Sequence, residues 1–278
     1  MNVKLPSVKK YIRSPNGIII KVIQNEQQID NSVVKFKKGK AEGHMLRYKG
    51  EDLLILEKNR VNTVISGYRR ILYSDKVLVI EDNQELDLND LKWIKHPLLT
   101  DEYLEKHNNK YVFDTWKGAF TYKVDKPDDP GLRIPQIGAL HAIEAHWCIS
   151  EEIANVVLPT GTGKTETMLS CLICNTISSL LVIVPTDALR DQLALKFSTL
   201  GVLPKFSIVN EECENPVVGL IEHGFKTKEE IVTFFDQINV AVATMSVVAM
   251  ASSEIQYEIA QRVSHLFIDE AHSIGALG

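Results

Sequence analysis

Long apolar runs are missing from this chain of 278 residues. No stretch approaches the roughly 18 apolar residues that cross a bilayer, and the N-terminus, MNVKLPSVKK, lacks the apolar segment of a signal peptide. Cysteine is scarce too, with four residues and one CxxC, Cys171 and Cys174, that has no second pair; this favours packed thiols over disulfides or zinc. These absences predict a cytoplasmic protein without a membrane partner.

The charge of the chain is small in total but uneven. The net charge is -5, from 31 basic and 36 acidic residues. Residues 1–80 hold 16 basic and 7 acidic residues, whereas residues 131–278 hold 8 and 17. The basic first segment suits a polyanion such as nucleic acid, although a solvated lysine-rich surface has the same composition.

Two segments with different patterns make up the chain. From Gly17 to Asp82, short β-branched runs alternate with turn residues, which predicts antiparallel strands of a small β-rich domain. The expected strands are 17–24, 32–39, 52–58, 61–68 and 76–82. Residues 123–135, KVDKPDDPGLRIP, have the proline and aspartate content of a linker. We therefore predict a β-rich accessory domain over residues 1–127 and a second domain over residues 128–278.

The second domain repeats the order strand, turn, helix. Its strands are continuous apolar runs, which are typical of a mostly parallel sheet with helices on both faces and predict an α/β domain. The expected strands are 155–159, 179–185, 239–244 and 265–270, and the expected helices are 135–150, 161–177, 186–200, 226–238 and 245–263. Ligands of such sheets bind at the carboxyl ends of the strands.

Residues 158–165, LPTGTGKT, predict a phosphate-binding loop between a strand and a helix. The glycines let the backbone curl so that N–H groups face phosphate oxygens, Lys164 reaches the β- and γ-phosphates, and Thr165 is a ligand of Mg²⁺. Leu158 stands where the general pattern has its first glycine. We expect ATP and Mg²⁺ as ligands. The expected contacts are Thr160, Gly161, Thr162, Gly163, Lys164, Thr165 and Glu166.

The last expected strand ends in HLFIDEAH, which places Asp269, Glu270 and His272 at the edge of the sheet. Asp269 would hold Mg²⁺, and Glu270 would act as the general base on the attacking water. Lys164 and Glu270 are therefore the expected catalytic residues. The tetrapeptide alone fits a solvated strand end equally well, and its pairing with the upstream loop favours the functional interpretation.

Together these two motifs resemble the superfamily 2 helicases and translocases. The resemblance covers residues 132–278 and implies a RecA-like P-loop domain. Gln136, in LRIPQ, matches a glutamine that reads adenine in the family. VPTDALRDQL and VATMSV resemble two family motifs that hold nucleic-acid phosphates, which implies contacts from Thr186, Arg190 and Thr244. Thr186 also fits a helix N-cap.

The stretches PTGTGKTE and PTDALRDQ are closer to DNA-acting motors of restriction, repair and phage defence than to RNA helicases. The resemblance implies an ATP-dependent helicase or translocase that acts on DNA, with residues 1–125 contacting DNA or a partner protein. The family's second RecA-like domain and its arginine fingers have no match in the sequence, so we expect a fragment with little ATPase activity of its own. The alternative is a nucleotide-binding switch or scaffold without motor activity.

The basic first segment generates a testable prediction. If it binds duplex DNA through phosphates, each contact should contribute about 0.9 to the slope of log affinity against log salt concentration. The candidate contacts are Lys35, Lys37, Lys38, Lys40, Arg69 and Arg70. Replacing the four lysines by glutamine should lower both the affinity and the slope, measured by DNA binding at several salt concentrations. Unchanged values would instead indicate a solvated or protein-binding surface.

Overall fold

The computed structural model describes residues 1–39, 41–57, 66–80 and 85–271. The chain forms two compact units. Unit 1 consists of Met1–Lys10 and Val22–Lys106, and unit 2 consists of Tyr11–Lys21 and His107–Gly278. No helix in the described ranges is both long and apolar enough to cross a membrane.

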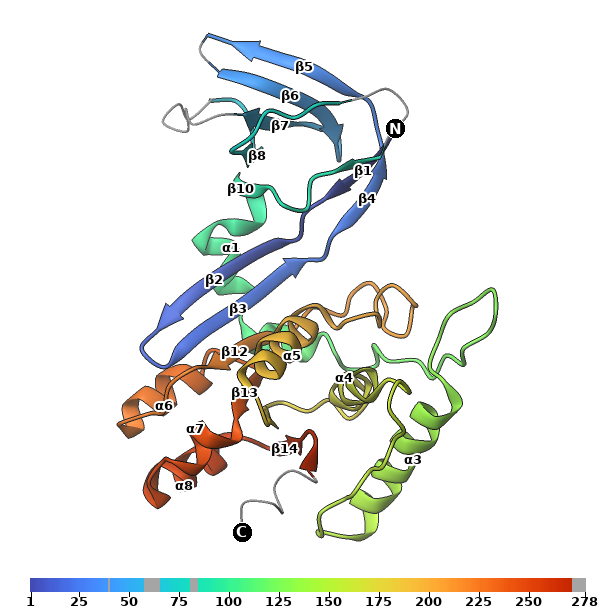
Figure 1. Cartoon of the computed structure of the whole chain (residues 1–278), viewed down its shortest axis with the longest axis vertical. Coiled ribbons are helices and arrows are strands. Elements are labelled where there is room, and N and C mark those ends of the chain that lie inside the picture. Colours follow the sequence, from blue (N-terminus) through green and yellow to red (C-terminus); the bar gives the residue numbers. More distant parts are fainter. Residues whose placement is uncertain (40, 58–65, 81–84, 272–278) are drawn as a thin grey trace. The chain divides into compact units, whose positions relative to one another are not determined.

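Unit 2 is built on a six-stranded sheet of order β14-β11-β13-β12-β3-β2 (Figure 1). β11 pairs in parallel with β13 and β14, and β12 pairs in parallel with β13. β3 adds to β12 in the antiparallel direction, which the sequence pattern did not predict. The strands are β2 (Val8–Ser14), β3 (Gly17–Gln24), β11 (Leu180–Val184), β12 (Val217–Ile221), β13 (Val240–Thr244) and β14 (His265–Ile268). The predicted α/β class is confirmed.

The middle strands of this sheet are buried along their whole length. β11, β12 and β13 read LLVIV, VVGLI and VAVAT, and every position is buried, as in strands covered on both faces. α5 packs against all three strands, and α3 packs against α4. The helices of unit 2 are α2 (Asn109–Asp114), α3 (Ile134–Ile149), α4 (Lys164–Cys174), α5 (Asp187–Thr199), α6 (Lys228–Phe235), α7 (Met245–Ala249) and α8 (Ser253–Arg262).

Polar caps fix where three of these helices begin. Thr186, Thr227 and Ser252 each accept a hydrogen bond from the backbone N–H three residues further on, at the start of α5, α6 and α8. Ser252 also explains why the helix expected over residues 245–263 is divided into α7 and α8. The cap at Thr186 sets the N-terminus of α5 directly after the carboxyl end of β11.

Unit 1 contains two sheets, of order β4-β1-β9 and β10-β8-β7-β6-β5 (Figure 1). One buried core joins them, with Leu5 from β1, Leu46 from β6, Leu53 from β7 and Leu72 from β8. The strands are β1 (Asn2–Leu5), β4 (Gln27–Asp30), β5 (Val33–Lys38), β6 (Ala41–Tyr48), β7 (Glu51–Glu57), β8 (Arg70–Ser74), β9 (Leu86–Asp87) and β10 (Lys92–Lys95). A 3-10 turn, η1 (Pro97–Leu99), and helix α1 (Asp101–Lys106) follow.

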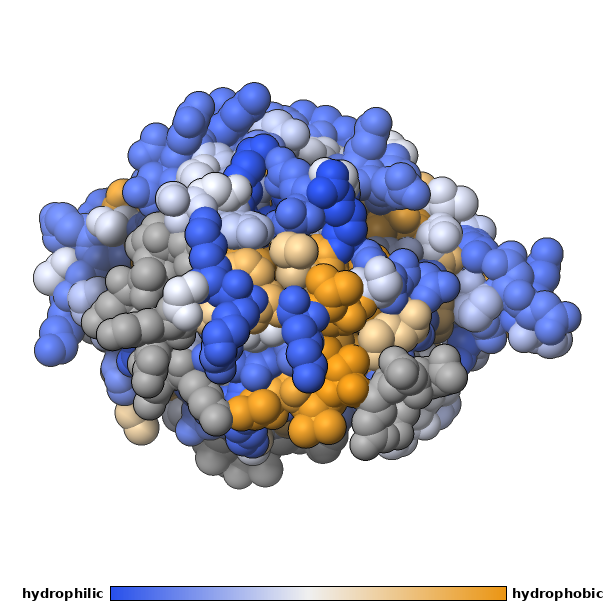
Figure 2. Space-filling model, turned by 90° about the horizontal axis from the view of Figure 1, so that it is seen from above, coloured by the Kyte–Doolittle hydropathy of each residue, from blue (hydrophilic) through white to orange (hydrophobic). Residues whose placement is uncertain are grey.

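The alternation of side chains along β7 produces two apolar clusters. Leu53 and Ile55 join the first core, whereas Leu54 and Leu56 join a second cluster, because successive side chains point to opposite faces of a strand. Phe36 of β5 packs against the second cluster. Figure 2 looks onto the end of the molecule at which β5 and β6 lie in Figure 1, and it shows hydrophobic residues gathered among hydrophilic ones.

The two units differ from the domains expected on either side of residue 128. Unit 2 already includes His107 and takes in Tyr11–Lys21 as well. Trp116 is fully buried, and its indole N–H donates to the carbonyl oxygen of Glu214 at 2.9 Å. The residues before the expected linker therefore pack with the α/β half. Residues 17–21 of β3 join the same half through backbone pairing with β12.

Predicted strands of the first segment are found at β3, β5 and β7. The strand expected at 61–68 falls mostly outside the described residues, and residues 77–80 form no strand. β6 and β8 were not predicted.

The strand predicted at residues 155–159 does not form. Ile153 and Val157 are 87% and 92% exposed. An apolar segment forms a buried strand only where it can pair with the edge of a neighbouring strand. No described strand pairs with this segment. The phosphate loop therefore follows a segment without regular secondary structure rather than a strand. β12, in contrast, lies in a stretch for which no strand was predicted.

The pairing of β3 with β12 generates a stability prediction. A Cβ added at Gly17 would overlap the carbonyl oxygen of Leu220. Gly17→Ala should therefore destabilise the protein by about 2 kcal/mol, since the strands must move apart. Gly138→Ala is the matched control, because an added Cβ there meets nothing within 4 Å in α3, and it should stabilise by about 0.5–1 kcal/mol. Urea denaturation measures both, and equal midpoints for the two variants would contradict the pairing.

Candidate nucleotide-binding site

The glycine-rich loop leads directly into α4, which begins at Lys164. Gly161 and Gly163 have φ angles of 80° and 90°, in the left-handed region that glycine adopts without strain. The first N–H groups of a helix have no partner within the helix. The start of α4 therefore offers hydrogen-bond donors and the positive end of the helix dipole to an anion.

Two side chains at the start of α3 hold this loop. Gln136 Nε2 donates to the Gly163 carbonyl at 3.0 Å, and Arg133 Nη1 donates to the Gly161 carbonyl at 2.6 Å. The two residues are also joined, because the Arg133 backbone N–H donates to Gln136 Oε1 at 2.8 Å. We call Arg133 and Gln136 the loop clasp. Sequence reasoning missed Arg133, although its spacing from Gln136 is that of the N-cap and N3 positions of a helix, where such bonds occur.

The loop clasp uses both ends of the Gln136 amide. This residue is only 4% exposed, and its amide oxygen and nitrogen are both bonded within the protein. A side chain that reads adenine needs an accessible donor and acceptor. In this arrangement the Gln136 amide holds the loop, and its expected contact with adenine remains a prediction.

Lys164 and Glu270 form an ion pair, with 2.8 Å between Nζ and Oε1. The hydrogen bond that the Lys164 ammonium donates to the Glu270 carboxylate raises the pKa of Lys164 above its ordinary value. Glu270 has a φ of 53°, which is uncommon for a residue with a side chain. The structure thus brings together the two expected catalytic residues, which are 106 positions apart in the sequence.

The carboxyl ends of three neighbouring strands lie at one edge of the sheet. Val184 of β11 is opposite Thr244 of β13, and Ile183 is opposite Ile268 of β14. Asp269 follows β14 and is held in place by its N–H, which donates to the Ile183 carbonyl at 2.9 Å. We call this edge the sheet rim. Of the DEAH letters, His272 lies outside the described residues.

Thr165 and Asp269 have the chemistry of a magnesium site. A hydroxyl and a carboxylate are hard oxygen ligands, and Mg²⁺ in phosphate-binding proteins takes most of its other ligands from water and phosphate. Across the described ranges there is no group of three or more His, Cys, Asp or Glu side chains that could hold a metal without such help. The residues present therefore fit Mg²⁺ that arrives with a nucleotide. Among the other expected contacts, Glu166 pairs with Lys196 at 3.7 Å, Thr160 is exposed and the Thr162 hydroxyl donates to the Pro159 carbonyl at 2.6 Å.

The three expected nucleic-acid contacts differ in exposure. Thr186 is exposed, and its hydroxyl caps α5. Arg190 is 7% exposed, and its guanidinium pairs with Asp187 at 2.8 Å and Asp191 at 2.9 Å. Thr244 is 3% exposed, and its hydroxyl lies 3.1 Å from the hydroxyl of Ser246. Two carboxylates neutralise Arg190 in this arrangement, and its expected phosphate contact remains a prediction.

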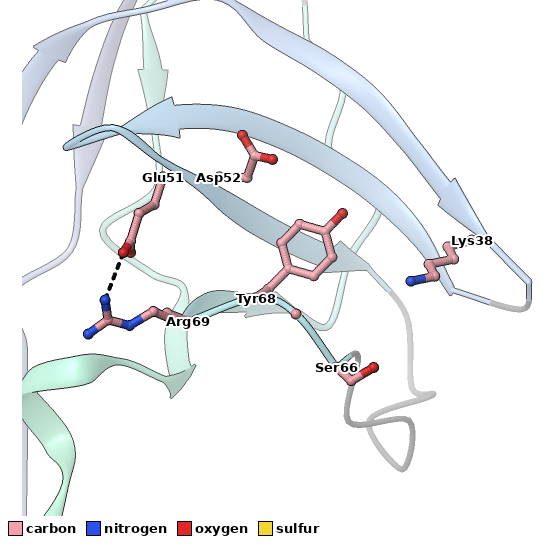
Figure 3. A pocket seen from close by; sticks show the side chains of 7 residues that line it. Lys38, Glu51, Asp52, Ser66, Tyr68 and Arg69 are labelled. Atoms are coloured by element: carbon pink, nitrogen blue, oxygen red, sulfur yellow. Dashed lines mark hydrogen bonds and ion pairs between the residues drawn. The ribbon is translucent and has the colours of Figure 1, made fainter.

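Ion pairs neutralise part of the basic segment. Lys37 pairs with Glu42 at 2.6 Å, and Arg69 and Arg70 both pair with Glu51. Figure 3 shows Arg69 directed to Glu51. These two residues and Lys38 line a hollow of about 460 Å³. Lys40 lies outside the described residues. The positive charge available to a polyanion is therefore smaller than the sequence count indicates.

The CxxC residues lie on α4, and the structure supports their interpretation as packed thiols. Burial raises the pKa of the Cys171 thiol to about 12, and burial also raises the pKa of the Cys174 thiol. Both residues are free cysteines. Thiols that stay protonated are poor metal ligands and poor nucleophiles.

Comparison with known families agrees with this geometry. The family described as type III restriction enzyme, res subunit, matches residues 129–277, which is more than half of the chain. The fold and the site define a superfamily 2 helicase-like ATPase domain. Within that class, the chain belongs to the family of type III restriction enzyme res subunits. No curated protein matches the chain.

The contact between the loop and the clasp generates a prediction. A Cβ at Gly163 would overlap the Gln136 amide nitrogen. The φ of Gly163 is 90°, which a residue with a Cβ adopts only with strain. Gly163→Ala should therefore lower ATP affinity at least about tenfold, since strain of about 1–2 kcal/mol is added to the loss of the bond. Gly118→Ala is the control, because it has a φ of 71°, meets nothing within 4 Å and lies outside the loop. Titration with a fluorescent ATP analogue measures both, and tight binding by Gly163→Ala would contradict the geometry.

Proposed function

We propose that this protein is a DEAH-type, ATP-dependent helicase or translocase that acts on DNA. The observation that supports the proposal most is the ion pair between Lys164 and Glu270. It joins the lysine of a phosphate loop to a carboxylate at the end of a parallel strand, which are the two groups needed to bind a triphosphate and to activate water.

The proposed roles follow from charge. Lys164 and the loop N–H groups neutralise the β- and γ-phosphates, and Glu270 accepts a proton from the attacking water. Thr165 and Asp269 would hold Mg²⁺, which supplies charge neutralisation on the phosphates when bound. In the structure, the Lys164 ammonium donates a hydrogen bond to the Glu270 carboxylate. A γ-phosphate that draws Lys164 away would therefore also free the carboxylate that acts on water.

The proposed nucleic-acid contacts lie along the sheet rim. Thr186 and the backbone N–H groups at the start of α5 follow β11, and Thr244 ends the neighbouring β13. A helix N-terminus favours phosphate without reading sequence. The same rim carries Asp269, so bound nucleic acid would lie near the strand that presents the catalytic carboxylate. The choice of DNA rests on the two motifs that resemble DNA-acting motors.

The accessory unit is proposed to contact DNA or a partner protein. Its candidate surface is reduced to the lysines of β5 for which no ion pair appears in the described residues, Lys35 and Lys38. Both lie near Lys37, which Glu42 neutralises. Weak, salt-sensitive binding is therefore expected from this strand.

The division of roles predicts different effects of two substitutions. Lys164→Ala should abolish ATP binding, because the loop then lacks its phosphate-neutralising ammonium. Glu270→Gln should keep ATP binding and slow hydrolysis by about 10²- to 10⁴-fold, since only the general base is lost. Equilibrium binding and phosphate release, both with and without DNA, separate the two effects.

An exposed carboxylate provides the control for this pair. Glu254→Gln in α8 removes one negative charge away from the loop and should change neither measurement. Near-normal hydrolysis by Glu270→Gln would show that another carboxylate is the base, and Glu166 would be examined next.

A further inference from the structure

We propose that one face of the five-stranded sheet in unit 1 binds single-stranded nucleic acid, with bases stacked on Phe36 and Tyr68 and phosphates held by lysines at its margins. We call this side of the sheet, which carries the second apolar cluster around Leu54 and Ile71, the outer face. The proposal rests on the proposed function, because it names the ligand of the accessory unit.

The register of the strands assigns residues to the outer face. Residues directly opposite each other on neighbouring strands share a face of the sheet. One row runs across four strands and consists of Val34, Met45, Leu54 and Ile71. β10 continues the row with Lys95, which is opposite Ile71. The outer face therefore has an apolar centre and a basic margin at β10.

β5 forms the opposite margin of the outer face. Lys38 is opposite Ala41, which packs against the second apolar cluster together with Phe36. Lys35 precedes Phe36 and points to the other face, because successive side chains of a strand alternate. Of the two lysines proposed above as DNA contacts, only Lys38 therefore belongs to the outer face.

The apolar side chains of the outer face differ in exposure. Leu54 and Ile71 are buried, whereas Phe36, Met45 and Tyr68 pack against their cluster and keep part of their surface exposed. The rings of Phe36 and Tyr68 meet edge to face, with 5.8 Å between their centroids and 81° between their planes. Hydrophobic residues gather at the end of the molecule where β5 and β6 lie (Figure 2). Partly exposed aromatic rings are stacking platforms for bases of any sequence.

The charge of the outer face suits a polyanion. Lys38, Lys92 and Lys95 are exposed, and within the described ranges none of them forms an ion pair. Asp52 is neutralised by Arg47, its partner across the strands, at 3.0 Å. Lysines at both margins of an apolar centre can hold phosphates while bases lie between them.

A hollow of about 460 Å³ joins the two kinds of contact. Lys38 and Tyr68 both line it, together with Arg69, whose charge is compensated by Glu51 at 2.8 Å (Figure 3). Its volume lies in the range of small-ligand sites. The hollow therefore brings an ammonium group and an aromatic ring to one place, as a phosphate and its neighbouring base require.

An apolar aromatic face favours single strands over duplexes. The bases of a duplex are paired and stacked on one another, so a sheet face meets mainly phosphates and sugars. A single strand also exposes the faces of its bases, and these can stack on Phe36 and Tyr68. Duplex DNA gains only the contacts with lysine and should bind more weakly.

The test measures fluorescence anisotropy of a labelled oligothymidylate and of a duplex of the same length, with the full chain and without ATP. Phe36→Leu and Tyr68→Leu keep an apolar side chain but remove the ring, so each should weaken single-strand binding at least about fivefold and leave duplex binding nearly unchanged. Tyr257→Leu is the matched control, because it removes an exposed ring of α8 and should change neither affinity.

The lysines are tested by salt dependence. Lys38→Gln should lower single-strand affinity and reduce the slope of log affinity against log salt concentration by about 0.7, whereas Lys35→Gln should do so less. Lys106→Gln in α1 is the control, since it removes an exposed lysine of the same unit away from the sheet. Equal effects of Lys38→Gln and Lys35→Gln would mean that general charge, and not the outer face, holds the ligand, which would overturn the proposal.

Photocrosslinking locates the bases even if a variant folds poorly. A 5-iodouracil oligonucleotide bound to the wild-type protein should crosslink to Phe36 or Tyr68, identified by mass spectrometry of the peptides. Crosslinks in unit 2 alone, or single-strand affinity that neither ring variant lowers, would overturn the proposal and favour a protein partner for this face. Both outcomes leave the proposed function intact, whereas a protein that binds neither ATP nor any nucleic acid would overturn that function as well.

Discussion

The site depends on the parallel pairing of β11 with β13 and β14. This register sets Val184 beside Thr244 and Ile183 beside Ile268, so segments from distant parts of the sequence end at one rim. Because the rim also meets the start of α4, Glu270 comes within 2.8 Å of Lys164. β11 and β13 contribute buried apolar stretches, and the sheet brings the ends of all three strands to one place.

Two different interactions prepare the phosphate loop. The loop clasp holds the carbonyls of Gly161 and Gly163, which leaves the N–H groups at the start of α4 directed to a ligand. The ion pair with Glu270 keeps the Lys164 ammonium protonated and compensated. A triphosphate therefore meets an ordered loop, and it replaces one carboxylate as the partner of Lys164. The reorganisation that remains is the breaking of the ion pair between Lys164 and Glu270.

The sequence predicted the elements that short-range patterns determine. It did not predict the elements that depend on pairing between distant strands. The loop, the capped helix after Thr186 and the apolar runs of β11, β13 and β14 have short-range patterns, and all were predicted. The segment 155–159 has a similar apolar content, but no described strand pairs with it, and it is mostly exposed and without regular secondary structure. The addition of β3 to the sheet depends on a contact almost 200 residues distant along the chain, which no local pattern records. Likewise, Gln136 and Arg190 match sequence motifs of ligand-binding residues, but the fold buries both side chains.

The most direct test of this account is a crystal structure of the protein with Mg²⁺ and a non-hydrolysable ATP analogue. The account predicts that the triphosphate accepts hydrogen bonds from the loop N–H groups and from Lys164, that the distance between Lys164 Nζ and Glu270 Oε1 exceeds the present 2.8 Å, and that Arg133 and Gln136 keep their bonds to the loop. A nucleotide bound elsewhere, or one bound at the loop while Lys164 remains on Glu270, would contradict it.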